Sequence, residues 1–311
     1  MEGLPLADAH CDFLYYMHRE GWSVLAPKGR QAVALPYMQE ANVALQFFAA
    51  WVDGEASTGG MQQCVALIDA YWRMLEEAGG ALTPLTAAFL PGKGQVATVL
   101  TIEGGEAIGG SLEALRMFYR LGARAMTLTW NYSNELASPA VRRLNRGLTP
   151  TGRRVVKEMN RIGMALDVAH LSDAGISEAL ALTERPIFAS HSNARAMCPH
   201  RRSLTDAHIR EIARGGGLIC VNYYPPQLRA DGKETAAVDV ARHAAYIASL
   251  AGPEHVALGS DFDGMFTYPR DLKNQRCLPA LVRALSEAGF SQGELRRVAY
   301  DNLRDYIIQF V

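Results

Sequence analysis

Short apolar runs alternate with longer amphipathic segments along the whole chain. The short runs are rich in β-branched and other apolar residues, as buried parallel strands usually are. They predict eight strands, at residues 4–10, 43–51, 96–102, 124–129, 163–169, 186–190, 217–222 and 255–260. The longer segments place apolar residues at helical spacing. They predict eight helices, at residues 61–79, 111–121, 151–161, 173–183, 205–214, 235–250, 278–288 and 291–308.

The order of these segments predicts the fold class. Strand and helix alternate eight times over 311 residues, which is typical of an α/β protein with a (β/α)8 TIM barrel. An open, doubly wound parallel sheet is the alternative architecture. The sequence has no fixed-period repeat, low-complexity segment or interdomain linker. We therefore expect one domain over residues 1–311.

Composition narrows the classes of partner and the compartment. Hydrophobic residues make up 49% of the chain and charged residues 20%, so a substantial core is expected. A formal net charge of −1 disfavours a nucleic-acid-binding surface. Neither a long apolar run nor a basic leader is present, so we expect no membrane partner. Five scattered cysteines without C-x-x-C spacing favour reduced thiols and a cytoplasmic protein.

The segment 131–154 contains five arginines among prolines and glycines, at positions 142, 143, 146, 153 and 154. Clustered guanidinium groups can bind a phosphate or a carboxylate. A basic loop in solvent explains the same composition without a ligand. We favour the solvated loop.

Ionisable residues stand at the ends of five predicted strands. They are His10 and Asp12, Glu103, His170, His191, and Asp261. In a barrel the carboxyl ends of all strands meet at one mouth, so these side chains should lie together. A buried cluster of this kind is costly unless its members are paired or bind metal. A pair such as His10 and Asp12 alone also fits an aspartate that merely orients a histidine.

Three histidines, an aspartate and a glutamate suffice for two metal ions if one carboxylate bridges them. Glu103 is the best candidate for the bridge, because its strand lies between the first and the fifth. The following Gly104 and Gly105 leave room for substrate or metal. Two divalent ions about 3.5–4 Å apart would acidify a water between them. Asp261 then fits a carboxylate that moves a proton from this water to the leaving group.

These residues, in this order, resemble the membrane dipeptidase (renal dipeptidase) family of zinc-dependent metallopeptidases. The resemblance extends from residue 6 to about residue 303. The matching motifs are His10-x-Asp12, Glu103-Gly104-Gly105, His170, His191, Arg202, Gly259-Ser260-Asp261-Phe262-Asp263-Gly264 and Asp301-Asn302-Leu303. Each motif is weak alone, but their order and spacing together are specific. The resemblance implies a TIM barrel of the metal-dependent hydrolase type.

The resemblance also implies roles for individual residues. One zinc ion would bind His10, Asp12 and Glu103, and a second would bind Glu103, His170 and His191. Asp261 would be the proton shuttle. Arg202 matches the arginine that binds the C-terminal carboxylate of the substrate, although a surface arginine beside Arg201 is the plainer interpretation.

Two positions depart from the family pattern, and both concern the substrate. Trp130 stands where family members often have a histidine that polarises the scissile carbonyl; Asn131 or the second zinc would have to replace it. Gln227 stands where a tyrosine helps to hold the substrate carboxylate. We expect Trp130, Asn131 and Tyr223 to contact substrate together with Arg202. Ser203 replaces the usual asparagine after the paired arginines, a smaller difference.

The sequence thus predicts a binuclear zinc dipeptidase that cleaves free dipeptides, of L-L and L-D configuration. One rival is an amidohydrolase that acts on N-acyl amino acids; another is a metal-binding relic that has lost catalysis at Trp130. The only expected partner is the dipeptide substrate, with a homodimer left open. The remaining histidines, at positions 18, 200, 208, 243 and 255, lack strand-end placement. His208 and His243 are expected to be surface or packing residues, whereas His18, two turns beyond Asp12, is near enough in sequence to reach the mouth.

Overall fold

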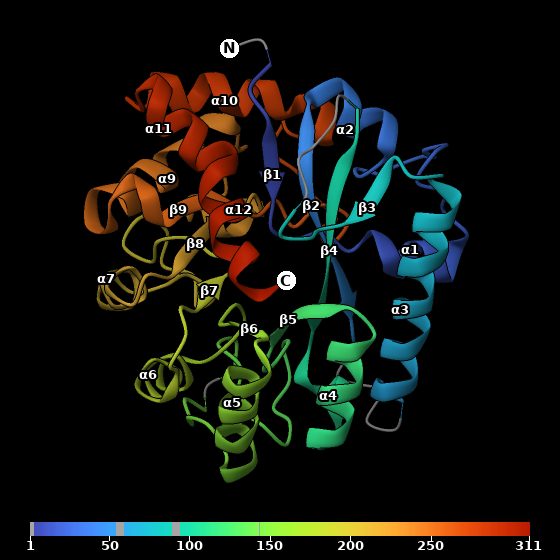
Figure 1. The fold of residues 1–311 in the computed structure, drawn as a ribbon. Helices are drawn as coiled ribbons and strands as arrows, with labels where there is room; N and C mark the ends of the chain where they lie inside the picture. Colours follow the sequence, from blue (N-terminus) through green and yellow to red (C-terminus); the bar gives the residue numbers. More distant parts are fainter. Residues whose placement is uncertain (1–2, 54–58, 89–93, 143) are drawn as a thin grey trace.

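Parallel strands form a ring that is covered by helices on its outside (Figure 1). The structure is a computed structural model and describes residues 3–53, 59–88, 94–142 and 144–311. Eight strands within these ranges follow one another around the ring in the order β1-β2-β4-β5-β6-β7-β8-β9, and β3 pairs with β4 beside this path. The strands are β1 Leu6–Asp8, β2 Val43–Trp51, β3 Leu82–Pro84, β4 Val96–Glu103, β5 Ala123–Thr127, β6 Ala165–Asp167, β7 Phe188–Ala189, β8 Leu218–Val221 and β9 Val256–Leu258.

Hydrogen bonds between the first and last strands nearly close the ring. The Ala9 N–H donates to the Leu258 carbonyl at 2.9 Å, and the Asp12 N–H donates to the Phe262 carbonyl at 3.0 Å. Cys11 forms a parallel bridge with Phe262. All neighbouring strands are parallel, without the reversal of strand order that a doubly wound sheet requires. The TIM-barrel prediction is therefore confirmed, and every predicted strand overlaps one strand of the ring.

Each predicted helix is present, and all but the end of the last one lie in the outer layer. The α-helices of the described ranges are α1 Phe13–Glu20, α2 Leu35–Ala41, α3 Gly60–Glu77, α4 Leu112–Arg120, α5 Pro150–Ile162, α6 Asp173–Leu182, α7 Asp206–Arg214, α8 Pro225–Leu228, α9 Ala237–Ala251, α10 Leu278–Glu287, α11 Gln292–Arg296 and α12 Asn302–Ile307. The last predicted helix is interrupted by a π-helical turn at Arg297–Asp301. None of the described helices has the length and apolarity needed to cross a membrane.

The barrel interior is filled by apolar side chains and closed at one end by α12. Phe47 and Phe188 face each other across the interior at a ring distance of 6.3 Å, and Tyr306 of α12 lies 5.1 Å from Phe188. The Tyr306 hydroxyl donates to the carbonyl of Pro186, which precedes β7. Figure 1 shows α12 and the C-terminus near the centre of the ring. The amino ends of the strands are thus blocked, and access is left at their carboxyl ends.

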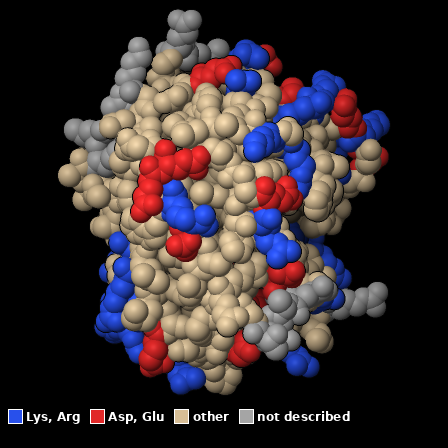
Figure 2. All heavy atoms as spheres, turned by 90° about the vertical axis from the view of Figure 1, so that its right-hand side faces the viewer, with Lys and Arg blue, Asp and Glu red and all other residues tan. Residues whose placement is uncertain are grey.

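Charged side chains on the face that carries α3 are mixed in sign. Figure 2 shows small acidic and basic groups there, separated by uncharged surface. In the segment 131–154, Arg142, Arg146, Arg153 and Arg154 are exposed, as predicted, and Arg143 lies outside the described residues. Arg142 stacks on Tyr132 at 4.8 Å from the ring centre. The described arginines of this segment therefore lie at the surface, where Arg153 pairs with Glu178 at 2.7 Å.

Candidate active site at the barrel mouth

The ionisable residues predicted from strand ends meet at the open mouth. His10 and Asp12 follow β1, Glu103 ends β4, His170 follows β6, His191 follows β7 and Asp261 follows β9. Because the strands are parallel, all of these side chains project from the same end of the barrel. The structure therefore brings together the residues that the sequence analysis selected.

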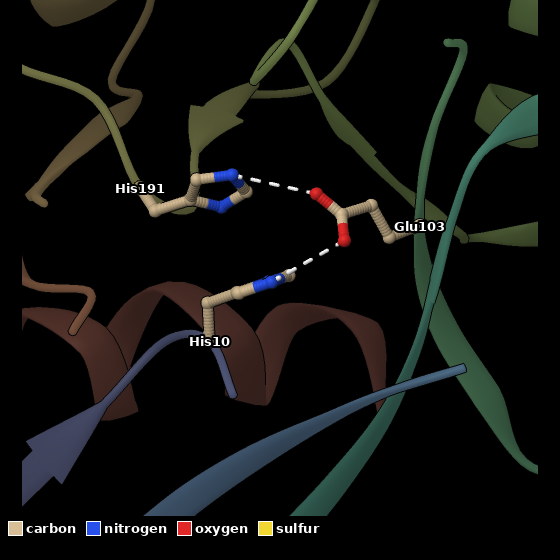
Figure 3. A group of neighbouring side chains, drawn as sticks. All are labelled: His10, Glu103 and His191. Atoms are coloured by element: carbon tan, nitrogen blue, oxygen red, sulfur yellow. Dashed lines mark ion pairs between the residues drawn. The ribbon is translucent and has the colours of Figure 1, made fainter. Parts of the chain in front are cut away.

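The Glu103 carboxylate lies at the centre of the cluster. Its Oε2 atom lies 3.5 Å from His10 Nε2. Its Oε1 atom lies 2.9 Å from His170 Nε2 and 3.4 Å from His191 Nε2. Figure 3 shows Glu103 reaching between His10 and His191, with one carboxylate oxygen toward each. This arrangement gives the carboxylate two separate faces, each with imidazole nitrogens beside it.

The donor atoms fit divalent metal ions. One ligand atom each from His10, Glu103 and His191 lie within 4.8 Å of one another, as do atoms from His10, Asp12 and Asp261. His10 Nε2 and Asp12 Oδ1 are buried without a hydrogen-bond partner among the described residues. Leaving such atoms unsatisfied costs about 1–3 kcal/mol each. Imidazole nitrogens and carboxylate oxygens are also the ligands that zinc prefers when no cysteine is available.

Burial and neighbouring charges shift the pKa values of the three histidines in different directions. Burial and the nearby Arg202 lower the pKa of His170 to about 4. Burial and the nearby His10 hold the pKa of His191 well below its usual value. Burial also lowers the pKa of His10, but the carboxylates of Glu103 and Asp12 outweigh it and raise this pKa well above the usual value. His170 and His191 are thus neutral imidazoles, the form that binds metal.

Hydrogen bonds at the far side of two rings hold them in place, and the bond to His170 also fixes its tautomer. His170 Nδ1 lies 2.9 Å from Asn131 Oδ1, an oxygen that can only accept, so Nδ1–H donates. His191 Nδ1 lies 2.8 Å from Ser190 Oγ. In both rings this leaves Nε2 facing Glu103, and such partners typically orient metal-binding histidines. Asn131, predicted as a substrate contact, thus also positions His170.

Two buried carboxylates below the cluster were not selected from the sequence. Asp8 Oδ1 accepts the Ser260 N–H at 2.7 Å, next to Asp261, and Asp8 also accepts the Ser260 hydroxyl. Asp167 Oδ1 accepts the Ala169 N–H at 2.9 Å and the Ser190 N–H at 3.0 Å. They hold the backbone that carries the cluster. The sequence indicates them only by position: Asp8 stands two residues before His10, and Asp167 stands three residues before His170.

Unusual backbone conformations allow the loops to present these side chains. His170 and Asp261 have φ angles of 66° and 64°, in the left-handed region, and non-glycine residues in this region are often found at functional sites. Gly264 is required for a steric reason, not for its backbone conformation. A Cβ atom there would lie 2.2 Å from Asp12 Oδ2 and 2.4 Å from Asp261 Oδ1. Glycine at 264 therefore lets these two carboxylates approach each other.

A cavity of about 530 Å³ leads to the cluster. Its lining includes Arg202, Trp130, Asn131, Tyr224 and Gln227. Arg202 is only 6% exposed. Its guanidinium forms no ion pair with a described carboxylate, although Nη2 approaches the His191 carbonyl at 3.5 Å. Burial lowers the pKa of Arg202 to about 10, so it remains charged at neutral pH. A buried cation without a carboxylate partner is suited to an anionic group of a substrate.

The lining of the cavity differs from the prediction at two positions. Tyr223 is fully buried, packs edge-on against Phe262 and does not line the cavity. Tyr224 lines it instead, because successive residues of extended backbone point to opposite sides. His200 was not selected, yet it lines the cavity, and its Nδ1 accepts the Arg202 N–H at 3.2 Å. His18 is exposed and does not line the cavity, whereas His208 and His243 are buried packing residues.

Comparison with known proteins identifies close relatives over the full length. Residues 1–305 match the family model of the membrane dipeptidases, peptidase family M19. The dipeptidase aclJ of Aspergillus oryzae is 31% identical over 324 residues, which cover 96% of this chain and 76% of the relative.

Solved structures agree. The metallopeptidase dipeptidase AC, of family M19, superposes with a TM-score of 0.93 at 30% identity over 99% of both chains. A metallopeptidase from Rhodobacter sphaeroides, liganded with a phosphinate mimic of the dipeptide L-Ala-D-Ala, superposes with a TM-score of 0.90 at 29% identity over 99% of both chains. The chain belongs to the membrane dipeptidase family of metallopeptidases.

Proposed function

We propose that this dipeptidase is a binuclear zinc enzyme that hydrolyses free dipeptides of L-L and L-D configuration. The observation that carries the proposal is the Glu103 carboxylate, which has His10 on one oxygen and His170 and His191 on the other. His10, Asp12 and Glu103 would hold one ion, and Glu103, His170 and His191 the other. Ions held there would supply Lewis-acid chemistry, which would polarise the scissile carbonyl and lower the pKa of water to near neutral pH. The dipeptide mimic in the Rhodobacter sphaeroides relative supports the substrate class.

Side chains of the protein bind the substrate, transfer the proton and orient the metal ligands. Arg202 binds the C-terminal carboxylate of the dipeptide, which places the peptide bond beside the cluster. Asp261 takes a proton from the attacking water and delivers it to the nitrogen of the leaving amino acid. Its Oδ2 accepts a hydrogen bond from Asn222 Nδ2 at 3.2 Å, which leaves Oδ1 for the proton. Asn131 and Ser190 keep the two histidines in one orientation.

A panel of L-L, L-D and D-L dipeptides together with N-acetyl amino acids tests the proposed activity. Each substrate is assayed with zinc and with a chelator. We expect zinc-dependent cleavage of L-L and L-D dipeptides and slow cleavage of the N-acetyl compounds. Faster cleavage of the N-acetyl compounds would identify an amidohydrolase of N-acyl amino acids instead. If no substrate is cleaved, the proposal of dipeptidase activity fails.

Two divalent ions per chain are expected in protein purified without chelator. Elemental analysis should approach two equivalents, and a reproducible value near zero would contradict the proposal. Glu103→Gln should lose more metal than His10→Ala, His170→Ala or His191→Ala, because both ions share this carboxylate. If Glu103→Gln keeps as much metal as the histidine variants, the carboxylate does not bridge.

Trp130→His should retain the metals and change dipeptide preference. Trp130 lines the cavity, with its ring centre 6.3 Å from that of His170 and 4.9 Å from that of Trp51. The tryptophan ring therefore acts mainly as an apolar wall. We expect less than about a tenfold change in kcat/KM on the best substrate, or about 1.4 kcal/mol. A gain of several hundredfold on every dipeptide would show that the natural chain lacks an essential catalytic group.

A further inference from the structure

Aromatic rings form a continuous wall along one part of the cavity. Tyr15 of α1 and Trp51 at the end of β2 contact each other edge to face, with ring centres 4.9 Å apart. Trp51 contacts Trp130 in the same manner, also at 4.9 Å. All three rings line the cavity. Edge-to-face contacts between aromatic rings are favourable and directional, so each ring holds its neighbour in place.

These rings differ from the aromatic residues of the core. Phe47 and Phe188 are fully buried inside the barrel, whereas Tyr15, Trp51 and Trp130 are only half-buried. Packing alone would favour complete coverage of such large apolar surfaces. Their uncovered surface borders the cavity that leads to Glu103. The wall therefore offers apolar area to whatever enters the cavity.

The aromatic wall and the Arg202 guanidinium are carried by different strands of the ring. Trp51 and Trp130 stand at the ends of β2 and β5, the strands on either side of the strand that carries Glu103. Arg202 lies in the connection that follows β7, and Gln227 lies in α8, which follows β8. In the order of the ring, β2 is opposite β7 and β4 is opposite β8. A dipeptide whose carboxylate binds Arg202 and whose peptide bond lies beside Glu103 must direct its N-terminal residue toward the wall.

We propose that Tyr15, Trp51 and Trp130 form a subsite for the side chain of the N-terminal residue, and that this enzyme prefers dipeptides in which that side chain is large and apolar or aromatic. The inference rests on the proposed function. Charge supports it, because the Asp263 carboxylate lines the cavity outside the metal cluster and would repel an acidic side chain. Asp12, Glu103 and Asp261 belong to the cluster, and Asp263 accepts the backbone N–H groups of Ala32 and Val33.

The test compares Phe-Ala, Gly-Ala and Asp-Ala, with alanine in whichever configuration the wild type cleaves faster. We expect kcat/KM for Phe-Ala to exceed that for Gly-Ala by roughly tenfold or more, and Asp-Ala to be the poorest substrate. Trp51→Ala should remove most of this preference and change kcat/KM for Gly-Ala by less than about threefold. The loss should appear mainly in KM, because an apolar wall binds the ground state and the transition state alike.

Two further variants distinguish a subsite from a structural effect. Trp51→Phe keeps an aromatic ring and should restore most of the preference for Phe-Ala. Trp72→Ala is the matched control, because Trp72 is 42% exposed on α3 and does not line the cavity. It should leave all three rates unchanged. A wild type that cleaves Gly-Ala as well as Phe-Ala, or a Trp51→Ala variant that loses both equally, overturns the inference and leaves the dipeptidase proposal standing. If the zinc-loaded protein cleaves no dipeptide, both are overturned.

Discussion

Asp261→Asn is expected to lower kcat by about 10²–10⁴-fold while both metal ions stay bound. Burial, with added repulsion from Asp12 and Glu103, raises the pKa of the Asp261 carboxyl to about 7. Asparagine keeps the shape of the side chain but has no basic oxygen to accept a proton. The variant therefore retains the geometry of the site and loses the proton transfer. Single-turnover kinetics and elemental analysis on the same preparation measure the two effects separately.

Asp263→Asn is the matched control for this prediction. It makes the same change two residues further along, in a buried carboxylate whose oxygens accept the Ala32 and Val33 N–H groups at 2.7 and 3.2 Å. We expect a much smaller loss of kcat than at Asp261, together with a lower melting temperature. Asp261 also lies in the same donor group as His10 and Asp12. If Asp261→Asn empties a metal site, the residue is a ligand and the assigned proton transfer is wrong.

Arg202→Met is expected to reduce kcat/KM for free dipeptides by roughly 2–4 kcal/mol, or about 30- to 1,000-fold. The guanidinium is buried, and among the described residues it contacts the His191 carbonyl and no carboxylate. In the variant, the carboxylate of the substrate would enter the same buried position and find no cation. Methionine preserves much of the apolar stem, so the change removes charge more than volume.

A C-terminally amidated dipeptide and a neighbouring arginine provide the controls. The amidated substrate, itself poor, should be affected little by Arg202→Met, because it carries no carboxylate to lose its partner. Arg201→Met changes the exposed residue next in sequence and should leave both substrates nearly unaffected. Equal losses on the free and the amidated dipeptide would exclude a carboxylate-specific contact at Arg202.

The cluster was predictable because its residues all lie at the end of strands that apolar patterning identifies, or just after them. Once β1, β4, β6, β7 and β9 are placed in a parallel barrel, their carboxyl ends must meet. Contacts across the mouth were not predictable in this way. Two examples are the hydrogen bond that Asn131 accepts from His170 and the close approach of Asp12 and Asp261 to Gly264, which depend on loop paths that no periodicity encodes. For the same reason, Tyr223 was predicted to face the cavity, whereas Tyr224 lines it. A shift of one residue exchanges the two faces of an extended segment.

The fold was predictable to a similar extent, and the elements that escaped prediction are short. β3 has three residues and ends in Pro84, too few for an alternating pattern. α1 begins at Phe13, directly after the His10 and Asp12 motif, and buries only Phe13 and Leu14. Such a narrow apolar face gives little helical periodicity. The π-helical turn at Arg297–Asp301 preserves the apolar spacing closely enough that one helix was expected there.

The closure of the barrel by its first and last strands has a consequence during protein synthesis. Asp8 and Ser260, which join β1 to the loop after β9, are 252 positions apart. At about 5–20 residues per second, the ribosome needs on the order of tens of seconds to add the second partner after the first. Over this time β1 has an unpaired edge, and His10 and Asp12 lack Asp261 and Gly264 beside them. A nascent chain, or a product terminated before residue 256, therefore has no complete site and is expected to be inactive.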